Sequence, residues 1–146
     1  MSYKGIYRPS NPKKYKGDQS NIIYRSLWER KFMNYCDLNE NIIEWASEEF
    51  WIPYLDPTTN RVRRYFPDFF IKYKDKENNI RRSVIEVKPM RETLEPKATK
   101  GKSRKTLINE SVTYVKNQAK WKAAKEFCAD RKLEFKIMTE KELGIR

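Results

Sequence analysis

Histidine is absent from the 146 residues of this chain, and cysteine occurs only twice. Without histidine, the chain cannot form a histidine-based catalytic triad, an HNH-type nuclease site or a Cys/His zinc site. Cys36 and Cys128 fall in helix-like apolar patterns, so we expect reduced core residues of a cytosolic protein. No apolar run is long enough to span a membrane, and the first residues lack the apolar segment of a signal peptide.

The chain carries a large excess of positive charge. Its 32 Lys and Arg residues outnumber 20 Asp and Glu residues, for a formal net charge of +12, and the basic residues recur throughout the sequence. We expect a polyanionic partner, DNA or RNA and not a membrane, because no amphipathic basic helix is evident. A soluble basic protein without such a partner is the open alternative. This length predicts one domain with its own core.

Residues 65–89 contain two apolar runs of strand-like composition, joined by the turn-like sequence KDKENN, which predicts a β-hairpin. Asp68 interrupts the first run, and Glu86 interrupts the second, two positions before Lys88. Residues two apart on a strand point to the same face, and pairing of the strands can bring Asp68 beside Glu86 and Lys88. Two carboxylates and an ammonium group meeting in this way suit a divalent cation with oxygen ligands.

The same pattern has an ordinary interpretation. Because 36% of the residues are charged, an acid can interrupt an apolar strand by chance, and Glu-x-Lys can be an ion pair on a solvated sheet. However, both acids are flanked by aromatic or aliphatic residues, so their segments should be mostly buried. Buried acids are usually paired or bound to a metal, which favours the functional interpretation.

The first half of the chain predicts an arm, a helix and three strands. Residues 1–20 are basic and lack periodicity, as in an extended arm that could lie on nucleic acid. A helix should begin at Ser26, whose capping box with Glu29 folds the glutamate back onto the Ser26 amide. Glu29 can serve this cap or a functional site, and both interpretations are open. A strand over 47–54 and the two strands of the hairpin should form an antiparallel meander.

The second half predicts a basic loop, a long helix, a strand and a short helix. The loop over 90–105 is either a flexible clamp on a phosphate backbone or a solvated linker. A helix over 106–132 has apolar residues at steps of three and four, from Ile108 to Phe127. Its length is that of a crossover, so the strand over 133–138 should lie parallel to the strand carrying Glu86. Thr139 and Glu142 then form a second capping box.

This αβββαβ order, with Pro67-Asp68 and Glu86-Val87-Lys88 on neighbouring strands, resembles the PD-(D/E)XK nuclease superfamily. The sequences YRSLWE, SEEFWIPY, YFPDFF and IEVKP extend the resemblance to a branch that joins phage junction-resolving endonucleases and endonuclease subunits of heteromeric cut-and-paste transposases. The ending, with KWKAAK and FKIMTEKEL, is still more similar to the head-completion nucleases of T-even-like tailed phages. The resemblance covers nearly all of the chain after the arm.

The resemblance implies a restriction-endonuclease-like α/β fold over residues 21–146, with a mixed four-stranded sheet flanked by helices. It implies that Asp68 and Glu86 bind a metal ion with the backbone carbonyl of Val87 and with Glu29 of the first helix. Lys88 would then act near the attacking water. The expected ion is Mg²⁺, with Mn²⁺ as a substitute.

The implied activity is hydrolysis of DNA phosphodiester bonds in phage head completion or DNA packaging. DNA would be held through its backbone with little sequence specificity, and phage head or portal proteins are further partners that the resemblance implies. The implied location is the cytoplasm of the infected host cell, or the virion. A non-catalytic basic virion protein that binds or plugs packaged DNA, and a junction-resolving endonuclease, are open alternatives. The residues expected to contact DNA are Arg25, Arg63, Arg64, Lys97, Lys100, Lys102, Arg104, Lys105, Gln118 and Lys122.

Overall fold

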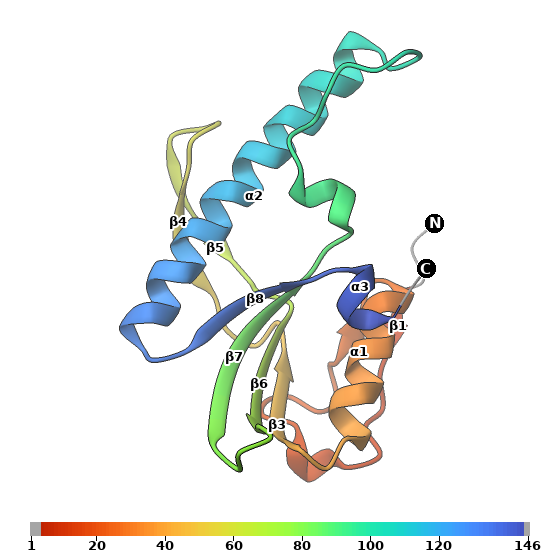
Figure 1. Ribbon diagram of the computed structural model, residues 1–146, viewed down its shortest axis with the longest axis vertical. Coiled ribbons are helices and arrows are strands. Elements are labelled where there is room, and N and C mark those ends of the chain that lie inside the picture. The colour runs from red at the N-terminus through yellow and green to blue at the C-terminus, as the bar shows by residue number, and fades with distance from the viewer. Residues whose placement is uncertain (1–3, 145–146) are drawn as a thin grey trace.

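The computed structural model describes residues 4–144, so three residues of the expected arm and the last two of the expected nuclease domain lie outside the described part. A mixed sheet of four strands, in the order β3-β6-β7-β8, forms its centre (Figure 1). The strands are β3 (Ile42–Ser47), β6 (Phe69–Lys74), β7 (Ile80–Val87) and β8 (Glu134–Met138). β3, β6 and β7 are antiparallel, while β8 lies parallel to β7. The predicted fold class and the parallel last strand are confirmed.

The prediction of one strand over 47–54 is wrong. The sheet strand β3 ends at Ser47, and Glu48 follows with a positive φ of 52°, which turns the chain away from the sheet. A separate antiparallel hairpin then forms from β4 (Ile52–Asp56) and β5 (Arg61–Tyr65). Only after this β4–β5 ribbon does the chain re-enter the central sheet at β6, so the ribbon is an insertion between two sheet neighbours.

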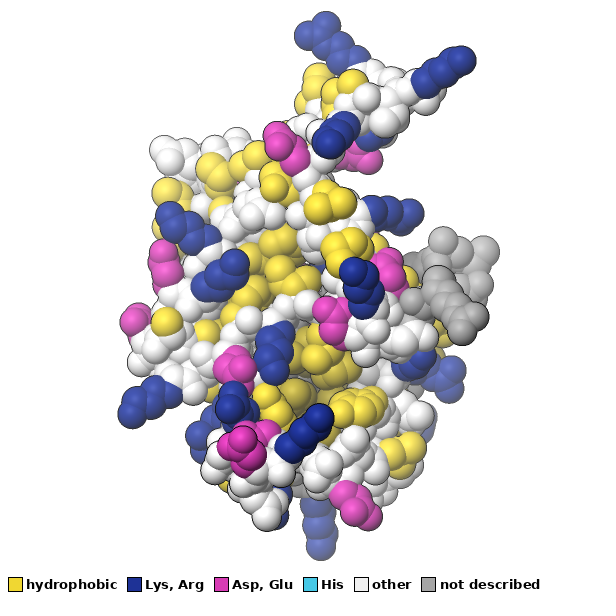
Figure 2. Space-filling model, in the orientation of Figure 1, with side chains coloured by type: hydrophobic (Ala, Val, Ile, Leu, Met, Phe, Trp, Pro, Cys, Tyr) yellow, Lys and Arg dark blue, Asp and Glu magenta, His cyan; other side chains and the backbone are white. Residues whose placement is uncertain are grey.

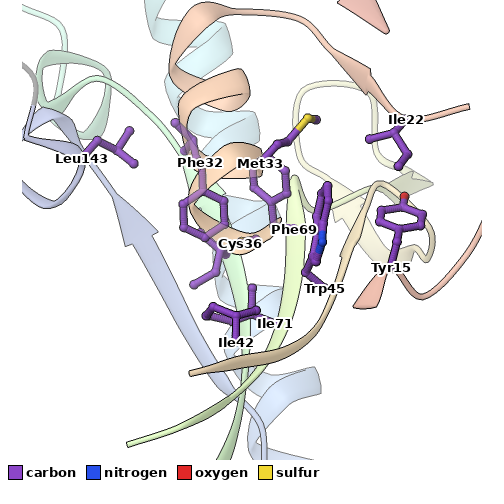
Figure 3. Close-up of a cluster of buried hydrophobic side chains, with 12 residues drawn as sticks. Tyr15, Ile22, Phe32, Met33, Cys36, Ile42, Trp45, Phe69, Ile71 and Leu143 are labelled. Carbon is purple, nitrogen blue, oxygen red and sulfur yellow. The ribbon is translucent and has the colours of Figure 1, made fainter. Parts of the chain in front are cut away.

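Helix α1 (Leu27–Leu38) covers one face of the sheet. Its buried face includes Phe32 and Cys36, and the ring of Phe32 lies 4.7 Å from that of Phe69 on β6 (Figure 3). Trp45 of β3 is fully buried in the same cluster. Both Cys36 and Cys128 are buried free thiols, as predicted. Burial of these large apolar side chains is the main stabilising contribution of this layer.

Helix α2 (Arg104–Asp130) follows the basic loop and packs against the ribbon and β8. Its buried face consists of Asn117, Trp121, Ala124 and Cys128, whereas Ile108, Val112 and Val115 are exposed. The predicted apolar face is therefore wrong for the first half of the helix. Figure 1 gives the reason, since the start of α2 extends beyond the sheet, where no strand of the sheet lies against it.

The end of the chain follows the predicted pattern. A capping box between Thr139 and Glu142 opens the short helix α3 (Glu140–Leu143), which packs near α1. The loop between β7 and α2 contains the 3-10 turn η2 (Met90–Thr93) and is held to α2 by an ion pair of 2.7 Å between Lys102 and Glu110. Within residues 4–144, no helix combines the length and the hydropathy needed to cross a bilayer.

The N-terminal segment lies on the domain. It contains two short paired strands, β1 (Gly5–Ile6) and β2 (Ile23–Tyr24), with the 3-10 turn η1 (Pro12–Lys14) between them. The Tyr7 hydroxyl and the Ser10 amide both donate to the fully buried carboxylate of Asp37, each at 2.7 Å. Tyr15 is also buried, with its ring edge-on to Trp45. These contacts hold the segment against α1 and β3.

Candidate active site

Asp68 and Glu86 stand opposite each other at the end of the β6–β7 ladder. Phe69 pairs with Ile85, and the next residues outward are Asp68 and Glu86. Because Phe69, Ile85 and Val87 point into the α1 core, the alternation of strand side chains directs the two acids to the other face of the sheet, toward α2 and the ribbon. The Val87 amide donates to Asp68 Oδ2 at 2.8 Å, which holds the carboxylate against β7.

The electrostatics of Asp68 show that negative charge is crowded here. Burial raises the pKa of Asp68 well above its usual range, and the charges of Glu86 and Glu29 raise it further. The Val87 amide and the Lys88 ammonium act in the opposite direction. Burial also raises the pKa of Glu86, against the effects of the Tyr65 hydroxyl, Lys88 and Lys120. The charges of Glu29, Glu86 and Lys88 therefore all lie near enough to Asp68 to influence its ionisation.

Glu29 lies in the first turn of α1. Burial raises the pKa of its carboxyl group, and the negative charge of Glu48 raises it further. Its amide donates to Ser26 Oγ, as the capping box predicts. Its carboxylate, however, accepts from the Ser26 hydroxyl at 3.2 Å, where the box predicts a bond to the Ser26 amide. Glu29 thus contributes to the cap and to the charge around Asp68.

Each of the three acids accepts a hydrogen bond from a different donor. Asp68 accepts from the Val87 amide, Glu86 from the Tyr65 hydroxyl and Glu29 from the Ser26 hydroxyl. As these side chains are placed, no group of three His, Cys, Asp or Glu side chains within residues 4–144 is arranged to hold a metal ion. The chemistry of the donors nevertheless fits a divalent cation, since they are oxygen ligands whose mutual repulsion a cation would relieve.

Two residues that sequence reasoning did not assign to the site lie against Glu86. The buried hydroxyl of Tyr65, the last residue of β5, donates to Glu86 Oε1 at 2.7 Å. Lys120 of α2 places its ammonium 5.7 Å from the centre of the Tyr65 ring, and its charge lowers the pKa of Glu86. Burial in turn lowers the pKa of Lys120. The signal available in the sequence was that Lys120 adjoins Trp121, a large apolar residue of the predicted helix.

The residues expected to contact DNA are spread over several elements. Arg25 forms a two-bonded ion pair with Glu48, and Arg63 pairs with the buried Asp56 at 3.1 Å. Lys102 is the partner of Glu110 described above, and Arg64 stacks on Trp51. The remaining predicted residues, all exposed, are Lys97, Lys100, Arg104, Lys105, Gln118 and Lys122. Figure 2 shows several Lys and Arg side chains projecting from the end formed by the basic loop and the start of α2.

Comparison with known proteins identifies the family. Residues 39–140 match the model of the TnsA-like endonuclease N-terminal domain, and this range contains Asp68, Glu86 and Lys88. The chain belongs to the TnsA-like endonuclease family. It is also 38% identical over 143 residues to the head completion nuclease of Enterobacteria phage T4, a match that covers 96% of this chain and 93% of that protein. The resemblance to head-completion nucleases and to transposase endonuclease subunits is confirmed.

The TnsA-like match begins after α1, so it includes the whole central sheet and the ribbon but not Glu29. The similarity to the phage T4 nuclease extends over nearly the whole chain. In this TnsA-like endonuclease, the acids of the β6–β7 hairpin therefore lie within the family's shared domain.

Proposed function

We propose that this protein is a metal-dependent DNA endonuclease that hydrolyses phosphodiester bonds during completion of the phage head. The observation that supports the proposal most is the position of Asp68 opposite Glu86, where a half-buried and a buried carboxylate repel one another beside Lys88. Membership of an endonuclease family and the similarity to a head completion nuclease support the reaction class and the biological context. DNA is the proposed substrate because the net charge of +12 favours a polyanion.

The proposed ion is Mg²⁺, with Mn²⁺ as a substitute, because both prefer oxygen ligands. Asp68, Glu86 and the backbone carbonyl of Val87 would hold it, with Glu29 as a further ligand. When bound, the ion would polarise the phosphodiester and lower the pKa of a water molecule.

The residues of the chain perform the other tasks. The Val87 amide holds Asp68 through Oδ2, and the Tyr65 hydroxyl holds Glu86, so both carboxylates are positioned before the substrate arrives. Lys88 follows Glu86 on the same face of the strand and would orient the attacking water or stabilise negative charge that develops on the phosphate. Lys120 adds a second positive charge near Glu86.

The exposed basic residues of the loop and of α2 would bind the DNA backbone, because such contacts depend on phosphate charge and not on base sequence. Binding is therefore expected to weaken steeply as salt concentration rises. Docking on phage head or portal proteins, and a place in the host cytoplasm or in the virion, are part of the same proposal.

The test is incubation of supercoiled plasmid with the purified protein in Mg²⁺, with EDTA in a parallel reaction. We expect nicked and linear products in Mg²⁺ only. Asp68→Ala and Lys88→Ala should fold and bind DNA but leave the plasmid intact, whereas Asp130→Ala, which removes an exposed acid at the end of α2, should cleave like the wild type. Mg²⁺-dependent nicking by Asp68→Ala would overturn the proposal.

Assays with the same purified protein distinguish two other functions. A non-catalytic virion protein would bind plasmid without nicking it under any metal condition. A junction-resolving endonuclease would cut a four-way junction in preference to a linear duplex of the same sequence, which a competition assay measures directly.

A further inference from the structure

The β4–β5 ribbon has two different faces. Its inner face contains Ile52, Tyr54 and Tyr65, which are buried against α2, with Tyr65 bonded to Glu86. The alternate residues form the outer face, and four of them are large apolar side chains exposed to solvent. They are Trp51 at 44%, Phe66 at 45%, Leu55 at 55% and Val62 at 73% exposure. The ribbon therefore carries aromatic side chains on the face opposite to Tyr65, the residue that bonds to Glu86.

The aromatic end of this face is the end nearest the acids. Ile52 pairs with Tyr65, so Trp51 and Phe66 are the next residues outward on the two strands. Phe66 is two residues before Asp68 in the chain. The guanidinium of Arg64 lies 4.7 Å from the centre of the Trp51 ring, and this places a cation on the same face. Two exposed rings and a stacked arginine thus adjoin the Ile52–Tyr65 pair, on the face opposite to the bond between Tyr65 and Glu86.

This combination fits unpaired nucleotides better than an intact duplex. A duplex presents its phosphates outward and keeps its bases stacked on one another, so lysine and arginine contacts suffice to bind it. Exposed aromatic rings and a flat guanidinium are the groups on which unpaired bases stack, without preference for sequence. Every base has an aromatic face, whereas a sequence-reading surface needs hydrogen-bonding side chains aimed at base edges.

We propose that Trp51, Arg64 and Phe66 form a stacking platform for unpaired nucleotides, so that the favoured substrate carries a single-stranded segment next to the bond that is cut. This inference rests on the proposed function, since it specifies the DNA that the site acts on. The ribbon carries the platform on one face and Tyr65, the partner of Glu86, on the other. A base bound on the platform would therefore fix the position of the adjoining backbone relative to the acids.

The test measures binding in EDTA, so that cleavage is not required. Anisotropy gives the dissociation constants of a blunt duplex and of the same duplex with a single-stranded oligothymidine extension. We expect the extension to tighten binding of the wild type by about tenfold, the magnitude typical of stacking one or two bases on aromatic side chains. The ratio of the two dissociation constants, blunt duplex over extended duplex, should fall to near one in Trp51→Ala. It should recover in Trp51→Phe, which keeps an aromatic ring.

Two further measurements separate stacking from a change in fold. Trp51 is exposed, Trp28 is partly buried, and Trp45 and Trp121 are buried, so quenching of tryptophan emission by the extension should depend mainly on Trp51 and fall sharply in Trp51→Ala. Arg64→Lys keeps the charge but removes the flat cation, and it should also reduce the ratio. Tyr35→Ala, which removes another exposed aromatic ring from α1, serves as the matched control and should keep the wild-type ratio.

The inference is overturned if the wild type binds both DNAs equally, or if Trp51→Ala keeps the wild-type ratio, an outcome expected when this face binds a protein. Failure of the proposed function is a separate result. It would appear as absence of Mg²⁺-dependent plasmid nicking by the wild type, whatever the ratio of dissociation constants in EDTA.

Discussion

Replacement of Tyr65 by phenylalanine isolates the contact between the ribbon and the candidate active site. The change removes one hydroxyl group, which donates to Glu86 Oε1 at 2.7 Å in a buried position. A hydrogen bond to a charged group contributes about 1.5–3 kcal/mol, and the buried carboxylate loses this donor. We therefore expect Tyr65→Phe to lower the free energy of unfolding by about 2 kcal/mol, or the midpoint of thermal unfolding by about 4–8 °C.

Tyr54→Phe is the matched control for this experiment. Tyr54 lies on the same inner face of the ribbon, is buried, and places its ring 5.9 Å from the Lys120 ammonium. Within residues 4–144, its hydroxyl forms no hydrogen bond to another side chain, so its removal should change stability by less than about 0.5 kcal/mol. Guanidinium unfolding in metal-free buffer measures both variants. Equal stabilities of the two would refute the assigned role of the Tyr65 hydroxyl.

Four further predictions concern other residues. Lys120→Met should reduce the rate of plasmid cleavage by about tenfold or more, because it removes positive charge beside Glu86, while Lys125→Met on an exposed face of α2 should not. Asp37→Ala should cost about 3 kcal/mol and expose the N-terminal segment to trypsin, since the Asp37 carboxylate accepts a hydroxyl and two backbone amides there. Burial raises the pKa of Cys128 to about 11, so the folded state favours its thiol, and stability should hold below about pH 8.5 and fall as pH rises toward 11. At about pH 8 both buried thiols should react with a thiol reagent at least about 100-fold more slowly than in the unfolded chain.

The hairpin, the crossover and the final capping box were predictable because each depends on local patterns. Two β-rich runs around a polar turn specify the β6–β7 pairing, and a helix of crossover length specifies a parallel β8. The sheet strand β3 was missed because side chains on both of its faces are buried or half-buried, so residues 42–47 show no alternation. The positive φ of Glu48, which separates β3 from the ribbon, has no comparable sequence signal.

From the residue pattern alone, the candidate site was predictable only where its residues are neighbours on paired strands, whereas Glu29 of α1 entered through the family resemblance. Asp68, Glu86 and Lys88 follow from strand periodicity, but Tyr65 and Lys120 depend on how the ribbon and α2 pack across the sheet. The apolar spacing of α2 also pointed to a face that is exposed in its first half and only partly buried in its second, because periodicity does not reveal how far a helix extends beyond its sheet.

The central claim is that the carboxylates around Asp68 repel one another until a cation binds among them. Thermal unfolding of the wild type and of Asp68→Asn, each in EDTA and in saturating Mg²⁺, tests this claim most directly. We predict that Asp68→Asn unfolds at a higher temperature than the wild type in EDTA, because one of the crowded charges is gone. Mg²⁺ should stabilise the wild type by about 2–3 kcal/mol at about 100 times its dissociation constant and leave Asp68→Asn unchanged. Equal responses of the two proteins to Mg²⁺, together with equal stability in EDTA, would contradict the account.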